Sequence, residues 1–120
     1  MEPFEVWGSP EVARDVIYTE DFAGAAAALL NASDIKFDVF NVGSGEKTTV
    51  GDAVKLALKA AGHTPVKTEY KSSGPTTIKS RSLDISKIKK QLGWKPAYSA
   101  EQAIEETTKW WTENKGAWNK

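Results

Sequence analysis

At 120 residues, with 40% hydrophobic and 27% charged side chains, the chain is long enough for one domain and too short for two of ordinary size. Sixteen basic side chains balance sixteen acidic ones, which argues against nucleic acid or an anionic membrane as a partner. The absence of cysteine excludes disulfides and thiolate metal sites and fits a reducing compartment. The first residues do not resemble a secretion signal, and the longest apolar run, residues 22–30, is too short to span a bilayer, so we expect a cytoplasmic protein.

The first third of the chain predicts a short strand followed by a helix. Residues 16–18 are β-branched or aromatic and favour a strand. Thr19 is then expected to cap a helix over residues 22–30, with Glu20 and Asp21 near the positive end of its dipole. The alanines of this helix would let it pack closely against a sheet.

A second strand and helix are predicted next. The β-rich segment 37–42 ends at a glycine turn, residues 43–45. Thr49 followed by Asp52 is typical of a helix start, and apolar side chains at three- and four-residue spacing predict a helix from about residue 50. Gly62 suits the left-handed position that ends such a helix.

The second half predicts a half-exposed strand at residues 66–70, a loop at 72–75 and a short extended stretch at 78–83. Two helices follow. Asp84 is placed to cap the first, and Gly93 to end it. In the last, Ser99 and Gln102 form a capping box, and the side chains expected to face inward are those of Ala103, Ile104, Thr107, Thr108 and Trp111. Trp110 and Trp118 have no evident place.

The glycine turn, residues 43–48, has the strand–loop–helix position of a phosphate cradle. A dinucleotide fingerprint requires glycine at position 48, where Thr48 stands, and a Walker A loop requires glycine at position 46, where Glu46 stands. Because both templates fail, a tight turn with positive φ at one glycine is favoured over a phosphate site. His63 is interpreted as a loop residue, since no acid or nucleophile lies at a suggestive spacing.

Two separated signatures, residues 6–21 and 83–96, resemble the C-terminal part of the extended short-chain dehydrogenase/reductase family, the nucleotide-sugar epimerases, dehydratases and reductases. The resemblance covers almost the whole chain. Within the family, the chain is most similar to the GDP-fucose synthase branch. It implies a mixed α/β fold, the C-terminal portion of a Rossmann-type enzyme with short strands and about four helices. Residues 1–120 are then expected to form a single substrate-binding domain, without the dinucleotide-binding domain.

The resemblance also implies a set of nucleotide-binding residues. Arg14 matches the family arginine that contacts the nucleotide diphosphate, although composition alone favours an ordinary surface ion pair for it. Trp7 matches a tryptophan that lines the nucleotide pocket, and core filling is the equal alternative. Arg81, in the basic cluster with Lys79, has the spacing of a family residue that reaches the diphosphate; the alternative is a solvated strand edge. Asp84 and Trp94 are interpreted as architecture.

Complete family members transfer a hydride with NAD(P), using a glycine loop and a Tyr-x-x-x-Lys pair. Here the residues four positions after Tyr18, Tyr70 and Tyr98 are Phe22, Gly74 and Gln102. We therefore predict no catalytic residues, no metal and no cofactor in this chain, which is expected to bind a nucleoside diphosphate-sugar without being catalytic alone.

An alternative belongs to another class of protein. The chain could be a free-standing interaction module that docks with another chain, either a dinucleotide-binding domain or a second copy of itself. The apolar helix at residues 22–30 is the feature that separates the two hypotheses, because it would stay exposed in isolation.

The base, the sugar and the reaction type remain open, because the Pro-Asp-Gly usual in the fucose synthase branch appears only as Ser73-Gly74-Pro75.

Overall fold

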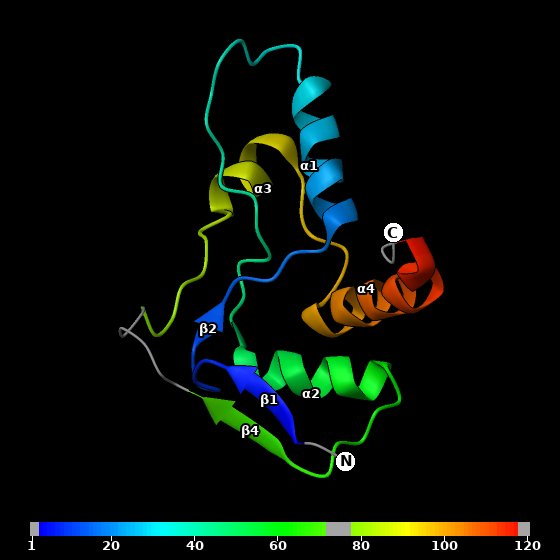
Figure 1. The fold of residues 1–120 in the computed structure, drawn as a ribbon. Helices are drawn as coiled ribbons and strands as arrows, with labels where there is room; N and C mark the ends of the chain where they lie inside the picture. The colour runs from blue at the N-terminus through cyan, green and yellow to red at the C-terminus, as the bar shows by residue number, and fades with distance from the viewer. Residues whose placement is uncertain (1–2, 72–77, 118–120) are drawn as a thin grey trace.

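The computed structural model describes residues 3–71 and 78–117 of the chain, which form a mixed α/β fold with short strands and four α-helices (Figure 1). The elements in chain order are β1 (Phe4–Trp7), β2 (Ala13–Arg14), α1 (Thr19–Leu30), β3 (Thr48–Thr49), α2 (Val50–Ala60), β4 (Thr68–Lys71), α3 (Ser86–Leu92), α4 (Ala100–Asn114) and a 3₁₀ turn (Lys115–Ala117). The loop predicted at residues 72–75 and the unplaced Trp118 lie outside the described residues.

The strands form two small sheets. β1 and β4 are parallel, with Phe4 opposite Thr68 and Trp7 opposite Lys71. The observed β4 overlaps the strand predicted at residues 66–70, whereas β1 has no counterpart in the sequence prediction. β2 and β3 are antiparallel and two residues long.

The strands predicted at residues 16–18 and 37–42 are wrong. Neither segment joins a sheet in the described part of the chain, and residues 37–42 run as an irregular segment between α1 and α3. The pairing falls instead on Ala13–Arg14, just before the predicted strand. A β-rich run favours a strand, but a strand also needs a partner, which local sequence does not supply.

The ends of the first two helices differ in how well they were predicted. α1 begins at Thr19, and Tyr18 holds the capping position without a side-chain hydrogen bond, so the cap predicted at Thr19 is wrong by one residue. α2 begins as predicted, because Thr49 Oγ1 accepts a hydrogen bond from Asp52 N at 3.0 Å. Gly62 follows this helix with φ 63°, the left-handed value predicted for it.

The last two helices have the expected ends except at the start of α3, where the cap predicted at Asp84 is wrong by one residue. α3 begins at Ser86, with Ile85 at the capping position; Asp84 Oδ1 still accepts a hydrogen bond from Ser86 N at 2.9 Å. Gly93 ends α3 with φ 63°. The capping box of α4 is confirmed, with Ser99 N donating to Gln102 Oε1 at 2.9 Å and Gln102 N donating to Ser99 Oγ at 3.2 Å.

The buried core is thin. Ala25, Ile85 and Ile88 form its centre, and α3 and the irregular segment pack around them; the partly buried side chains are those of Phe40, Val42, Leu92 and Trp94. The radius of gyration is 17.3 Å, against about 13.6 Å for a compact chain of this length. Several large apolar side chains consequently remain exposed. Thr107 and Trp111 were both predicted to face inward, and both are exposed, Trp111 by 51%.

α4 packs along α2, where Ala103 is buried and Lys59 Nζ pairs with Glu101 Oε1 at 3.0 Å (Figure 1). α1 is tied to the chain before α4 by Asp21. Its buried carboxylate accepts hydrogen bonds from Ala97 N at 2.9 Å and Tyr98 N at 3.0 Å. In the described part of the chain, no helix has the length and apolar character needed to cross a membrane.

Candidate functional site

β2 lies between two other segments of backbone. On one side it pairs with β3, with Arg14 opposite Thr48. On the other side Ala13 forms a parallel bridge with Ser80: Ala13 N donates to Lys79 O at 2.8 Å, and Arg81 N donates to Ala13 O at 3.1 Å. The structure thus brings three of the predicted binding residues, from positions 14, 79 and 81, onto neighbouring lengths of backbone.

The alternation of side chains along a strand assigns these three cations to one face. Ala13 and Ser80 are bridge partners and share a side, so Arg14, one residue after Ala13, and Lys79 and Arg81, which flank Ser80, belong to the opposite side. Lys79 and Arg81 are exposed, and Arg14 is half-buried. We call these three residues the cationic face. Arg14 and Arg81 are the only arginines of the chain.

The guanidinium of Arg14 is directed across this face. Its Nη1 donates to Ala13 O and to Ile78 O, both at 2.8 Å. The second contact ties Arg14 to the segment that carries Lys79 and Arg81. Two backbone carbonyls therefore help to orient this side chain, and a guanidinium group suits anions because its N–H donors lie in a fixed planar fork.

Asp15, next to Arg14, organises the backbone of both segments that flank β2, the glycine turn before β3 and the segment after Arg81. Its carboxylate accepts hydrogen bonds from Ser44 N at 2.6 Å, Ser44 Oγ at 2.7 Å, Gly45 N at 2.9 Å and Leu83 N at 3.1 Å. Burial alone would raise the pKa of Asp15, but these hydrogen bonds outweigh it and hold the pKa below its ordinary value. The ionised carboxylate therefore joins the glycine turn to the segment that follows Arg81.

Sequence reasoning missed the role of Asp15. The one available signal was its position within the Arg-Asp motif, next to Arg14, which was expected to contact the diphosphate. The same contacts confirm that residues 43–45 form a turn, with Gly45 at φ 76°. Two amides of this turn, Ser44 N and Gly45 N, already donate to a carboxylate, which leaves them unsuited to cradle a phosphate.

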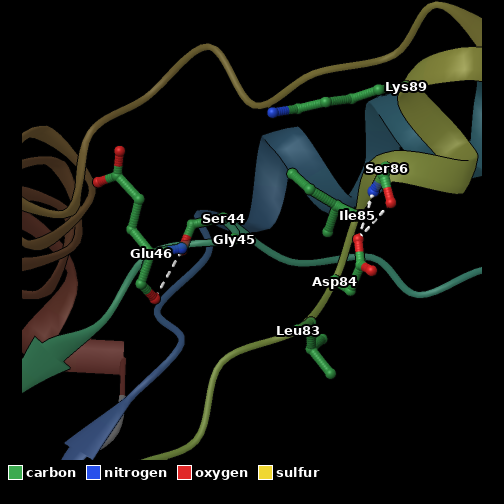
Figure 2. Close-up of a pocket in the computed structure, with 8 residues that line it drawn as sticks. All are labelled: Ser44, Gly45, Glu46, Leu83, Asp84, Ile85, Ser86 and Lys89. Atoms are coloured by element: carbon green, nitrogen blue, oxygen red, sulfur yellow. Dashed lines mark hydrogen bonds between the residues drawn. The ribbon is translucent and has the colours of Figure 1, made fainter.

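A hollow of about 440 Å³ lies beside this turn, between it and the start of α3 (Figure 2). Its lining residues are Ser44, Gly45, Glu46, Leu83, Asp84, Ile85, Ser86 and Lys89. It contains none of the predicted binding residues. Glu46 and Asp84 contribute two carboxylates against the single ammonium of Lys89, and hydrogen bonds from Ser86 lower the pKa of Asp84. This charge balance does not favour a diphosphate.

Trp7 lies at the end of β1, one short loop before the cationic face. Its side chain is 84% exposed, so the alternative that it fills the core is wrong. The indole N–H donates to Glu5 Oε1 at 2.8 Å. His63, beyond the end of α2, is exposed, as expected of a loop residue. The described residues contain no group of three or more histidine, aspartate or glutamate side chains that could hold a metal ion.

Comparison with known proteins identifies relatives of the chain. A family model described as GDP-mannose 4,6 dehydratase matches residues 2–107. A probable GDP-L-fucose synthase 1 of Oryza sativa subsp. japonica is 31% identical over 91% of the chain and 32% of that protein. A UDP-glucuronate 4-epimerase of Thermodesulfobacterium geofontis is 29% identical over 94% of the chain and 34% of that protein. The chain therefore spans about a third of the length of these relatives.

Solved structures agree with the sequence relatives. The crystal structure of the UDP-glucose 4-epimerase of Thermotoga maritima with UDP-glucose superposes on 94% of the chain with a TM-score of 0.79 and 30% identity. The match covers 36% of that protein. The fold predicted from the resemblance, a portion of a Rossmann-type epimerase or dehydratase, is thereby confirmed.

Proposed function

Because the chain belongs to the NAD-dependent epimerase/dehydratase family of extended short-chain dehydrogenases, we propose that it forms the nucleotide-sugar-binding part of such an enzyme. In this proposal residues 1–120 are one substrate-binding domain. The cationic face holds the diphosphate of a nucleoside diphosphate-sugar, and Trp7 packs against the base. The chain does not carry out hydride transfer alone.

One observation carries this proposal. Arg81 N donates to Ala13 O, the residue before Arg14, so the two arginines of the chain lie on neighbouring lengths of backbone although they are far apart in the sequence. A diphosphate presents several anionic oxygens close together, and guanidinium groups bind such oxygens in bidentate pairs. Because the chain has no net charge, a diphosphate would be attracted by a local group of cations, and the cationic face supplies three.

The residues present do not fit a dinucleotide cofactor. A pyrophosphate cradle requires free backbone amides at a glycine loop, whereas the amides of Ser44 and Gly45 donate to the Asp15 carboxylate. That carboxylate would also repel a phosphate. The related UDP-glucose 4-epimerase of Bifidobacterium longum is known in complex with NAD⁺ and UDP, and we assign NAD no residue of this chain.

Isothermal titration of the chain with GDP-, UDP- and dTDP-sugars tests the proposal. We expect measurable affinity for at least one of them, and a loss of about tenfold for each of Arg14→Ala and Arg81→Ala, because each removes charged hydrogen bonds to phosphate. Lys59→Ala is the matched control, since Lys59 is an exposed cation on α2 that pairs with Glu101 of α4. Unchanged affinity in both arginine variants would refute the site.

A second candidate function rests on exposed apolar surface. On α1, Phe22 is 55% and Leu30 is 87% exposed, and in the segment that follows, Phe37 is 91% exposed. Such a surface on a thin core favours association. We propose as the alternative that this surface docks with another chain, a dinucleotide-binding domain or a second copy.

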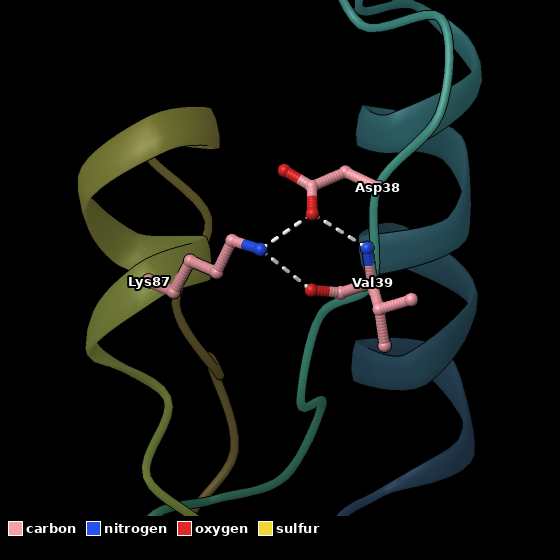
Figure 3. A network of polar contacts seen from close by, with 3 residues as sticks. All are labelled: Asp38, Val39 and Lys87. Atoms are coloured by element: carbon pink, nitrogen blue, oxygen red, sulfur yellow. Dashed lines mark hydrogen bonds and ion pairs between the residues drawn. The ribbon is translucent and has the colours of Figure 1, made fainter.

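The segment that carries Phe37 is tied to α3 by contacts at the next two residues. Lys87 Nζ donates to Val39 O at 2.9 Å and pairs with Asp38 Oδ1 at 2.5 Å, while Val39 N donates to the same aspartate oxygen at 2.7 Å (Figure 3). Light scattering during size-exclusion chromatography tests the alternative. We expect the mass to rise with concentration, and the rise to disappear in Phe37→Ser; a monomer at all concentrations would contradict it.

A further inference from the structure

A segment of backbone runs parallel to β2 and is joined to it by a short ladder of hydrogen bonds. Ala13 N donates to Lys79 O at 2.8 Å, and Arg81 N donates to Ala13 O at 3.1 Å. If this parallel register continued, Leu83 N would donate next to the backbone carbonyl of Asp15. The acceptor is instead the carboxylate of Asp15, whose Oδ2 lies 3.1 Å from Leu83 N. The side chain of Asp15 therefore supplies the next hydrogen bond of the ladder.

The two arginines of the cationic face lie within this ladder. Arg14 lies between Ala13 and Asp15, the two residues that supply acceptors to the donors Arg81 N and Leu83 N. The backbone of Arg81 is thus held at its own amide and again two residues later. Without the Asp15 carboxylate, the chain that follows Arg81 would lose its hydrogen bond to residue 15, and Arg81 would be held on one side only.

The Asp15 carboxylate is itself held firmly. Ser44 N, Ser44 Oγ and Gly45 N donate to it together with Leu83 N, which fills the roughly four acceptor positions of an ionised carboxylate. Burial would raise the pKa of Asp15, but these hydrogen bonds outweigh burial and hold the pKa below its ordinary value, so the group is ionised at neutral pH. Asp15 is therefore a fixed and charged connection between two segments of backbone.

We propose that Asp15 is a positioning residue for the cationic face, whose carboxylate fixes the separation of Arg14 and Arg81 and thereby sets the affinity for a diphosphate; this inference rests on the proposed function. Charged hydrogen bonds weaken when their distance or angle changes, so a diphosphate held by two guanidinium groups requires both at the right separation. Asp15 does not contact the ligand. It acts through the backbone that carries the two arginines.

Electrostatics alone predicts the opposite effect for this carboxylate. A negative charge next to Arg14 in the chain lowers the local positive potential, so neutralising Asp15 would by itself tighten the binding of an anion. If Asp15 positions the two arginines, neutralising it loosens the cationic face and weakens binding. The substitution Asp15→Asn therefore separates the two roles by the sign of its effect on affinity.

Isothermal titration with GDP-mannose, UDP-glucose and dTDP-glucose at pH 7 tests the inference. We expect Asp15→Asn to weaken the binding of each ligand that wild type binds by about three- to tenfold. Asp21→Asn is the matched control, because the Asp21 carboxylate also accepts hydrogen bonds from two backbone amides but ties α1 to the chain before α4. The affinity of this control should stay within about twofold of wild type.

A double variant shows whether the effect passes through the arginines. In the Arg81→Ala background, Asp15→Asn should change the affinity by less than about twofold, because the guanidinium that Asp15 positions is gone. If circular dichroism shows that Asp15→Asn does not fold, Asp15→Glu takes its place in each measurement. It keeps the charge but moves the carboxylate by one methylene, and should also weaken binding.

The inference and the proposed function fail in different ways. Unchanged or tighter binding in the Asp15 variant, an equal loss in Asp21→Asn, or losses that multiply in the double variant would overturn the inference, while the site formed by Arg14 and Arg81 would stand. If wild type binds none of the three ligands, or if Arg14→Ala and Arg81→Ala both keep the wild-type affinity, the proposed function and the inference are refuted together.

Discussion

Asp15 and Ser44 are joined by two short hydrogen bonds to one oxygen: both the amide and the hydroxyl of Ser44 donate to Asp15 Oδ1, at 2.6 and 2.7 Å. The other oxygen, Oδ2, accepts from Gly45 N and Leu83 N. One carboxylate thus connects three parts of the chain that are far apart in sequence. It does so at the residue that immediately follows Arg14 in the sequence.

Replacing this carboxylate should be costly. Asp15→Asn retains one acceptor oxygen but places an amide where Gly45 N and Leu83 N now donate, so two amides lose their acceptor. We expect a loss of about 2–4 kcal/mol in the free energy of unfolding, measured by urea denaturation at pH 7. Asp34→Asn, at an exposed aspartate, is the control and should change stability by less than about 0.5 kcal/mol.

The same group predicts a dependence on pH. The folded-state pKa of Asp15 lies below its ordinary value, so the ionised form stabilises the fold fully above the unfolded-state pKa of about 3.9. That contribution is lost as the pH falls through the folded-state pKa. The difference in stability between wild type and Asp15→Asn should therefore shrink on acidification below about pH 4. A difference that stays constant between neutral and strongly acidic pH would contradict this.

Two glycines should respond in opposite ways to alanine. At Gly43 a Cβ would lie 2.9 and 3.0 Å from the Asp15 oxygens and 3.0 Å from Leu83 Cδ1, so Gly43→Ala should destabilise the fold by about 1–3 kcal/mol. At Gly24, inside α1, a Cβ would meet only Trp94 Nε1, at an ordinary 3.6 Å. Gly24→Ala should stabilise by about 0.5–1 kcal/mol, because alanine favours a helix interior. Thermal melts of both variants provide the measurement.

Asp21 should matter as much as Asp15, for a different pair of elements. Asp21→Ala leaves Ala97 N and Tyr98 N without their acceptor and separates α1 from the chain that leads into α4. We expect a loss of about 2–4 kcal/mol by urea denaturation. Glu20→Ala is the adjacent control. It removes the exposed hydrogen bond from the Tyr98 hydroxyl, at 3.0 Å, and should cost less than about 1 kcal/mol.

Local sequence signals predicted several helix ends well, although the caps expected at Thr19 and Asp84 each lie one residue away. Thr49 with Asp52, Ser99 with Gln102 and the left-handed Gly93 were all identified, because each depends on groups within a few residues. The strands were predicted poorly. Whether residues 4–7 or residues 37–42 form a strand depends on a partner elsewhere in the chain, and β1 finds that partner at Thr68–Lys71.

The candidate site shows the same division. Arg14, Arg81, Lys79 and Trp7 were identified by resemblance to a family motif, yet the contacts that align the first three depend on the bridge between Ala13 and Ser80. Asp15 was missed. Its role arises from partners that only the fold supplies, Ser44 and Leu83.

The parallel pairing of β1 with β4 has a consequence for the order of folding. Phe4 pairs with Thr68, so about half of the chain, including α1 and α2, lies between β1 and its partner. Contacts between such distant positions form late, because closing the loop between them costs entropy first. The surface around Trp7 should therefore be assembled only near the end of folding, and a nascent chain should acquire it after β4 has left the ribosome.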